Sequence, residues 1–160
     1  MSIRAVFFDA GETLVHPHPS FPELVGEILR MEGHDISPEA VRGKVHLLSE
    51  QFARASRSGE LWTTSPERSK GFWLGVYETF LADLGVDAGG GTADLLYEEF
   101  TKLSNYRAFD DVPRALVRLA AAGLLLGVIS NFEEWLEQLL EHLDLARYFT
   151  VRIISGIEGI

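Results

Sequence analysis

Polar side chains that could do chemistry follow directly after two apolar segments. The segment AVFFDAGETLV, residues 5–15, carries one carboxylate, Asp9, from an apolar run into a short turn. A second apolar segment, LLLGVIS at 124–130, ends in the pair Ser130 and Asn131. A carboxylate in such a place can attack a substrate and form an acyl-type intermediate. A hydroxyl and nearby backbone N–H groups can hold an anionic oxygen. Taken singly, however, an aspartate or a Ser-Asn pair after a strand is more often a helix cap or turn former, so these residues alone leave a catalytic and a structural role open.

These groups meet only if the segments that carry them are neighbouring strands of one sheet. Residues 3–8 are almost wholly apolar, which is typical of a buried parallel strand. Residues 124–130 and 151–155 predict a second and a third strand. Because ligands of an open α/β sheet bind at the carboxyl ends of its strands, we expect Asp9 and Ser130 to converge there.

Helical patterns fill the rest of the chain and divide it into two parts. The patterns predict helices at 22–32, 37–57, 65–84, 92–103, 109–123 and 131–145. The first four form an all-helical insert after the first strand, and the last two alternate with strands, which implies a parallel α/β sheet. We therefore predict an α/β fold: a Rossmann-like three-layer core at 1–15 and 107–160, with a helical cap at 16–106.

One predicted helix bears directly on the candidate site. The helix at 131–145 begins close to Ser130 and carries acidic residues in its first turn, as the helix dipole favours. We expect the start of this helix, near Phe132, to help hold an anionic oxygen.

Composition excludes several classes of function. The formal net charge of −10 argues against general binding of nucleic acid or of anionic membranes, although a local site can still accept an anionic substrate. The chain has no cysteine, which excludes disulfides and thiolate chemistry. No apolar run reaches membrane-spanning length and no cleavage-type signal is visible. We expect a cytoplasmic protein that acts on a small molecule.

The order of these motifs resembles that of a known family. FFDAGETL matches the first motif of the haloacid dehalogenase-like hydrolase superfamily, GVISN matches its second, and YRAFDDVPRALVRLAAAG matches the usual lead-in to the second. The similarity is to the branch whose helical cap follows the first strand, and it covers essentially the whole chain. It implies that Asp9 is the nucleophile.

The resemblance also implies a reaction and a metal. In the phosphatases of this family the aspartate attacks a phosphoryl group, water hydrolyses the intermediate, and Mg²⁺ screens the charge. The metal would be held by the Asp9 carboxylate, by the backbone carbonyl of Gly11 and by a later acidic residue. We therefore expect a Mg²⁺-dependent phosphatase acting on a small phosphorylated metabolite. The alternatives are a metal-independent 2-haloacid dehalogenase and a non-catalytic relative that binds a ligand or partner.

Two departures from the family pattern matter. Gly11 stands where the family usually places a second acid, and Glu12, one residue further, is a candidate replacement because glycine makes the turn permissive. The family also has a lysine after the third strand and an acidic pair after the fourth, but no lysine follows Lys102 here. We therefore expect a chain truncated after the third strand, so that more polypeptide, or another chain, covers the open apolar edge at residues 3–8.

Overall fold

The computed structural model describes residues 3–59, 61–87 and 91–159. The chain divides into two compact units. The first unit comprises Met1–Pro17, Thr63–Pro66 and Tyr106–Ile160, and the second comprises His18–Trp62 and Glu67–Asn105. The four-residue segment Thr63–Pro66 therefore belongs to the first unit, although the chain on both sides of it belongs to the second.

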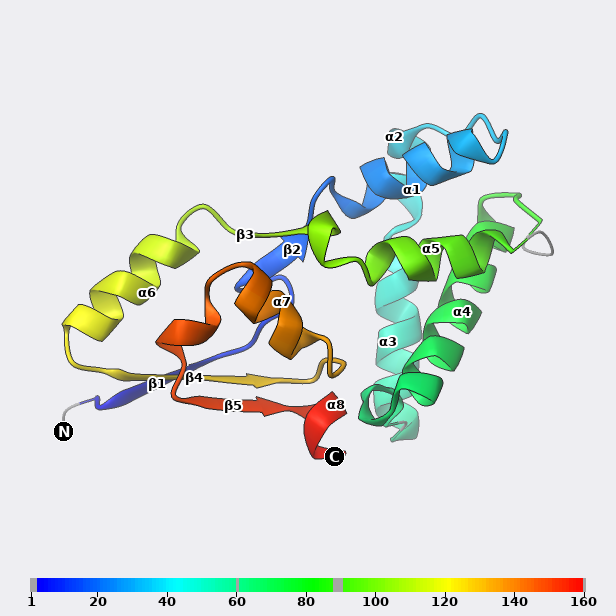
Figure 1. Cartoon of the computed structure of the whole chain (residues 1–160). Coiled ribbons are helices and arrows are strands. Elements are labelled where there is room, and N and C mark those ends of the chain that lie inside the picture. Colours follow the sequence, from blue (N-terminus) through cyan, green and yellow to red (C-terminus); the bar gives the residue numbers. More distant parts are fainter. Residues whose placement is uncertain (1–2, 60, 88–90, 160) are drawn as a thin grey trace. The chain divides into compact units, whose positions relative to one another are not determined.

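The first unit contains a three-stranded parallel sheet (Figure 1). Its strands are β1 (Ala5–Phe8), β4 (Leu125–Ser130) and β5 (Val151–Ile154), in the order β1-β4-β5. The three strands and their parallel direction are as predicted, so the α/β fold class is confirmed. The register places Phe8 opposite Val128 and Ser130 opposite Ile154, which brings the carboxyl ends of all three strands together.

Helices cover one face of this sheet. Helix α6 (Val112–Ala121) and helix α7 (Leu136–His142) lie on the same side of it in Figure 1, and the short helix α8 (Ser155–Glu158) follows β5. A 3-10 turn at Ala146–Tyr148 leads into β5. The buried core of this unit consists of apolar side chains from the strands, the helices and the loop after β1: Ala10, Leu14, Val15, Val112, Leu116, Leu126, Val128, Leu136, Leu139, Leu140, Leu145, Phe149 and Ile154.

The opposite face of the sheet is exposed. It carries five large apolar side chains that are 37–60% exposed, and we call them the open sheet face: Phe7, Leu125, Ile129, Val151 and Ile153. The prediction that β1 is a buried strand is therefore wrong, because none of the described helices packs on this side and β1 lies at an edge of the sheet. The expected open apolar edge at β1 is confirmed.

A second, smaller sheet was not predicted. Strand β2 (Val15–Pro17) pairs with strand β3 (Tyr106–Ala108) in antiparallel fashion, with Val15 opposite Ala108. At three residues each, these strands are too short to show an alternating pattern in the sequence. They join the part of the first unit that precedes the second unit in sequence to the part that follows it.

The second unit is helical. It is built from α1 (Phe21–Met31), α2 (Pro38–Lys44), α3 (His46–Ser58), α4 (Pro66–Asp83), α5 (Thr92–Phe100) and a 3-10 turn at Leu103–Asn105, while a further 3-10 turn, Trp62–Thr64, lies at its boundary. Its core includes Leu29, Val41, Phe80, Leu81 and Leu96, each no more than 1% exposed. Among the described residues, no helix combines the length and the apolar character needed to cross a membrane.

Two predicted helices have different limits in the structure. The helix predicted at 37–57 is interrupted at Val45, whose N–H bonds to the carbonyl of Arg42, three residues back, and Gly43 weakens the helix just before this point. The helix predicted at 131–145 begins only at Leu136. The intervening residues are held in another conformation by bonds to the segment after β5.

Candidate active site

The carboxylate of Asp9 is held by a hydroxyl from the neighbouring strand. Asp9 directly follows β1 and Ser130 ends β4, and the pairing of these strands brings the two residues together. The Ser130 hydroxyl donates a hydrogen bond to Asp9 Oδ1 over 2.8 Å. Ser130 is 6% exposed and Asp9 is exposed. A buried hydroxyl thus orients an accessible carboxylate, which is the arrangement that a nucleophile needs.

The loop after Asp9 is fixed by its own backbone. The carbonyl of Ala10 accepts hydrogen bonds from the N–H groups of Thr13, Leu14 and Val15, at 3.2, 2.8 and 3.1 Å. The Thr13 hydroxyl lies 3.4 Å from Asp9 Oδ2, a long contact that leaves this oxygen only weakly engaged. Asp9 therefore presents Oδ2 from a loop whose backbone is already ordered.

The candidate metal ligands, Asp9 and Gly11, lie in the same loop. They offer a carboxylate oxygen and a backbone carbonyl oxygen, and Mg²⁺ prefers oxygen ligands while keeping several waters. This oxygen-only donor set fits Mg²⁺. Within the described ranges, no group of three or more histidine, aspartate or glutamate side chains is arranged to hold a metal ion.

Asn131 belongs to a polar cluster that the sequence did not indicate. Its side-chain oxygen, Oδ1, accepts a hydrogen bond from the hydroxyl of Thr63, at 2.6 Å, and lies 3.0 Å from the hydroxyl oxygen of Ser155. These two hydroxyls are themselves 2.6 Å apart. Sequence analysis missed Thr63 because it lies 68 positions from Asn131, within a run of hydroxyl residues that reads as an ordinary helix start.

The loop after Asn131 is tied to the segment after β5. The N–H of Phe132 donates to Ser155 Oγ over 3.1 Å, and the Phe132 carbonyl accepts from the N–H of Gly156 over 2.9 Å. The Leu136 N–H bonds to the carbonyl of Glu133 and not to that of Phe132, and α7 begins only at Leu136. The expectation that a helix beginning near Phe132 helps to hold an anionic oxygen is therefore wrong.

The candidate replacement acid, Glu12, has an unusual backbone conformation, and its carboxylate interacts electrostatically with the Tyr106 hydroxyl. Its φ of 54° is in the left-handed region, which disfavours side chains other than glycine. Burial raises the pKa of the Tyr106 hydroxyl far above its usual value, and the carboxylates of Glu133 and Glu12 raise it further. Tyr106 thus stays protonated, and Glu12 is an electrostatic neighbour of a neutral phenol.

The sequence profile of the haloacid dehalogenase-like hydrolases matches residues 3–160. The chain belongs to the haloacid dehalogenase-like hydrolases. Among curated members, haloacid dehalogenase-like hydrolase domain-containing protein 3 of Danio rerio is 27% identical over 161 residues, which cover 96% of this chain and 64% of that protein. The chain therefore spans about two thirds of the length of that relative.

Solved structures show the same fold as this chain. The L-2-haloacid dehalogenase RSc1362 is 21% identical, with a TM-score of 0.69 and coverage of 100% of this chain and 67% of that one. The HAD-hydrolase YfnB from Bacillus subtilis, solved bound to magnesium, is 13% identical, with a TM-score of 0.72 and coverage of 100% and 68%. At these identities the likeness concerns the fold alone.

Proposed function

We propose that this hydrolase is a Mg²⁺-dependent phosphatase that acts on a small phosphorylated metabolite through a covalent intermediate on Asp9. The observation that carries the proposal is the 2.8 Å hydrogen bond from Ser130 to Asp9 Oδ1. It orients an accessible carboxylate at the end of β1, where ligands of parallel sheets bind. Ser130, Asn131 and Asp9 are the proposed site residues.

The reaction has two displacements. An oxygen of Asp9 forms a bond to phosphorus while the bond to the leaving oxygen breaks, and the leaving oxygen takes up a proton. Water then attacks the phosphorus of the aspartyl phosphate, which releases inorganic phosphate and restores the Asp9 carboxylate. Ser130, bonded to Oδ1, holds the carboxylate in one orientation through both steps.

The Asp9 carboxylate and the Gly11 carbonyl would hold the magnesium ion, with water completing its shell. When bound, Mg²⁺ offsets the negative charges of carboxylate and phosphoryl group. Magnesium in the fold-related YfnB supports this choice. The second unit is proposed to act as the cap that selects the substrate, and the net charge of −10 argues against nucleic acid as a partner.

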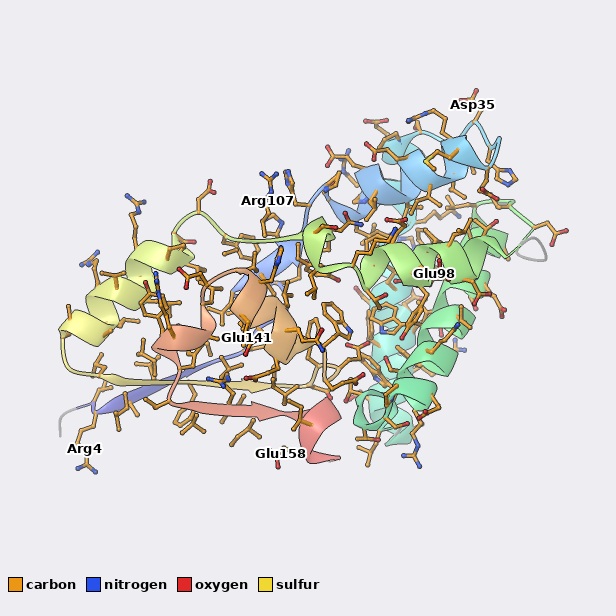
Figure 2. All side chains as sticks on the ribbon, viewed as in Figure 1. Arg4, Asp35, Glu98, Arg107, Glu141 and Glu158 are labelled. Carbon is orange, nitrogen blue, oxygen red and sulfur yellow. The ribbon has the colours of Figure 1, made fainter. Side chains whose placement is uncertain are left out.

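The test replaces the nucleophile by its uncharged isostere. Asp9→Asn should abolish the Mg²⁺-dependent hydrolysis of p-nitrophenyl phosphate and leave the circular dichroism spectrum unchanged. Asp35→Asn is the matched control, because Asp35 is exposed in the loop after α1 and projects away from the ribbon (Figure 2). If Asp9→Asn still hydrolyses this substrate, while EDTA abolishes hydrolysis by the wild-type protein, Asp9 has no part in the mechanism.

A haloacid dehalogenase is the second candidate, favoured by the absence of a second acid at Gly11 and by the fold of RSc1362. Metal separates the two, since EDTA should abolish phosphatase activity and spare halide release from 2-chloropropionate. A non-catalytic relative that binds a ligand or partner would show neither activity.

A further inference from the structure

Three side-chain oxygens form a closed triangle beside the proposed nucleophile. Thr63 Oγ1 lies 2.6 Å from Asn131 Oδ1 and 2.6 Å from Ser155 Oγ, and the third side, from Ser155 to Asn131, is 3.0 Å. Distances of 2.6 Å are typical of O–H···O bonds and short for N–H···O bonds. The oxygen of the Asn131 carboxamide, rather than its nitrogen, therefore faces the two hydroxyls.

The protons in this triangle can be assigned. Thr63 donates to Asn131, and Ser155 donates to Thr63 while accepting from the N–H of Phe132 at 3.1 Å. Each hydroxyl then donates its one proton and also accepts one hydrogen bond, Thr63 from Ser155 and Ser155 from the N–H of Phe132. Thr63 is 1% exposed, so its hydroxyl depends on these partners in place of water.

This arrangement leaves the nitrogen of the Asn131 carboxamide directed away from both hydroxyls. Asn131 is exposed, and it follows Ser130, which is bonded to Asp9. The two Nδ2 hydrogens are thus held in one orientation at the carboxyl end of β4. Donors fixed in advance bind developing negative charge without a cost of reorganisation.

We propose that Thr63 and Ser155 are positioning residues that hold the Asn131 carboxamide, so that its Nδ2 hydrogens bind a phosphoryl oxygen of the substrate. The inference rests on the proposed phosphatase function. It adds a role for Thr63. This residue lies in the segment Thr63–Pro66, which belongs to the first unit although the chain on both sides belongs to the second.

The first experiment measures the order of the Asn131 carboxamide in ¹⁵N-labelled protein by NMR relaxation. We expect an order parameter of about 0.8 in the wild type and in Thr63→Ser, and below about 0.6 in Thr63→Val and Ser155→Ala. Thr79→Val is the matched control, because the Thr79 hydroxyl bonds to the carbonyl of Gly75 in its own helix, at 2.8 Å. An equally rigid carboxamide in Thr63→Val would overturn the proposal.

The second experiment measures the binding of inorganic phosphate by calorimetry in the Asp9→Asn background, which removes the repulsion by the carboxylate, the need for metal and any turnover. Thr63→Val should weaken binding about fivefold, the effect of one lost hydrogen bond. Asn131→Ala should do the same, and adding Thr63→Val to it should change nothing further. An equal loss in the Asn131→Ala background would show that Thr63 acts by another route.

The outcomes separate this inference from the proposed function. Absence of phosphate binding, or binding that Asn131→Ala leaves unchanged, would overturn the donor role of Asn131 while the test of Asp9 by turnover stands. Turnover that survives Asp9→Asn would overturn the nucleophile and leave the phosphate measurements valid. If Thr63→Val fails to fold, Ser155→Ala and Thr63→Ser supply the same comparison.

Discussion

Gly11 stands two residues after Asp9, at the position where the resemblance implies a second acid. A Cβ added there would lie 3.5 and 3.7 Å from the ring of Phe132, which is ordinary contact distance. Gly11 is also not among the glycines with positive φ. Neither space nor backbone conformation therefore demands glycine, and a side chain can be introduced to test what the site lacks.

We predict that Gly11→Asp raises the turnover of alkyl phosphates, because their leaving oxygen needs a proton. General acid catalysis is worth roughly 10²–10⁴-fold, so a gain of about tenfold or more is expected even from imperfect placement. p-Nitrophenyl phosphate, with a good leaving group, should gain much less. Steady-state kinetics on both substrates measures the difference.

The matched control for this variant is Gly11→Asn, which has the same size and no acidic proton. It should leave both rates near the wild-type values. A gain by Gly11→Asn equal to that by Gly11→Asp, or no gain by either, would mean that another residue already supplies the proton, and Glu12 beside Tyr106 would be the first to examine.

Site residues at strand ends can be predicted from the sequence, because strand order brings them together. Site residues in loops cannot, because no local pattern reports their contacts. Asp9 and Ser130 end neighbouring parallel strands, and an apolar run followed by a polar residue marks each strand end in the sequence. Thr63 reaches Asn131 through a segment with no periodic pattern, so no local signal connects them.

At the scale of elements, two helical glycines differ in the space that a side chain would have. A Cβ on Gly156, in α8, would lie 2.4 Å from the backbone nitrogen of Glu134, whereas a Cβ on Gly75, in α4, would meet nothing within 4 Å. Gly156 thus permits the close approach of the segment after β5 to the loop after Asn131.

We predict that Gly156→Ala lowers the free energy of unfolding by about 2 kcal/mol, because backbone atoms have to move apart. Gly75→Ala should raise it by about 1 kcal/mol, since alanine favours a helix interior. Urea denaturation followed by circular dichroism measures both. Equal effects of the two substitutions would contradict the close approach at Gly156.

The end of α5 is stabilised by a carboxylate with two donors. Glu99 accepts hydrogen bonds from Lys102 and from Asn105, at 3.1 Å for the latter, and the bond from Lys102 is the main cause that lowers the pKa of Glu99. Because the folded state favours the charged form, this interaction stabilises the protein above pH 4.5 and is lost as the pH falls through the lowered pKa.

Accordingly, Glu99→Gln should destabilise the chain by about 0.5 kcal/mol at pH 7, and the difference from wild type should be smaller at pH 3. Thermal denaturation at the two pH values provides the measurement. Glu98→Gln is the control, because the neighbouring Glu98 is exposed on the same helix (Figure 2). A difference between Glu99→Gln and wild type that persists undiminished at pH 3 would refute the role of the charge.

The positions of most elements were predictable because hydrophobic periodicity determines them. The misses occur where hydrogen bonds outside the local pattern take over. The backbone of Phe132 is bonded to Ser155 and Gly156, so α7 starts at Leu136 despite helix-forming residues before it. The pairing of β2 with β3 joins residues about 90 positions apart, which a local pattern does not report.

At the scale of the whole molecule, the open sheet face departs from an ordinary surface. Phe7, Leu125, Ile129, Val151 and Ile153 gather on one side of three adjacent strands. Contiguous exposed apolar side chains mark surfaces that associate. Isolated apolar residues such as Met31, which is 84% exposed, carry no such implication.

We predict that the 160-residue chain associates with itself as its concentration rises, and that Ile129→Lys reduces this association because a charge at the centre of the face opposes its burial. Sedimentation velocity over a range of concentrations measures the effect. Met31→Lys should leave association unchanged. A wild-type chain that stays monomeric at millimolar concentration would show that the open sheet face is not adhesive.

The assignment of Thr63–Pro66 to the first unit has a consequence for how such proteins can be recombined. An inserted helical module is commonly treated as an exchangeable cassette, to be swapped between relatives in order to change substrate choice. Here, cutting out His18–Asn105 would also remove the hydroxyl that steadies Asn131. A chimera with a foreign insert would therefore inherit altered chemistry along with altered selectivity, unless its donor carries a hydroxyl at the equivalent place.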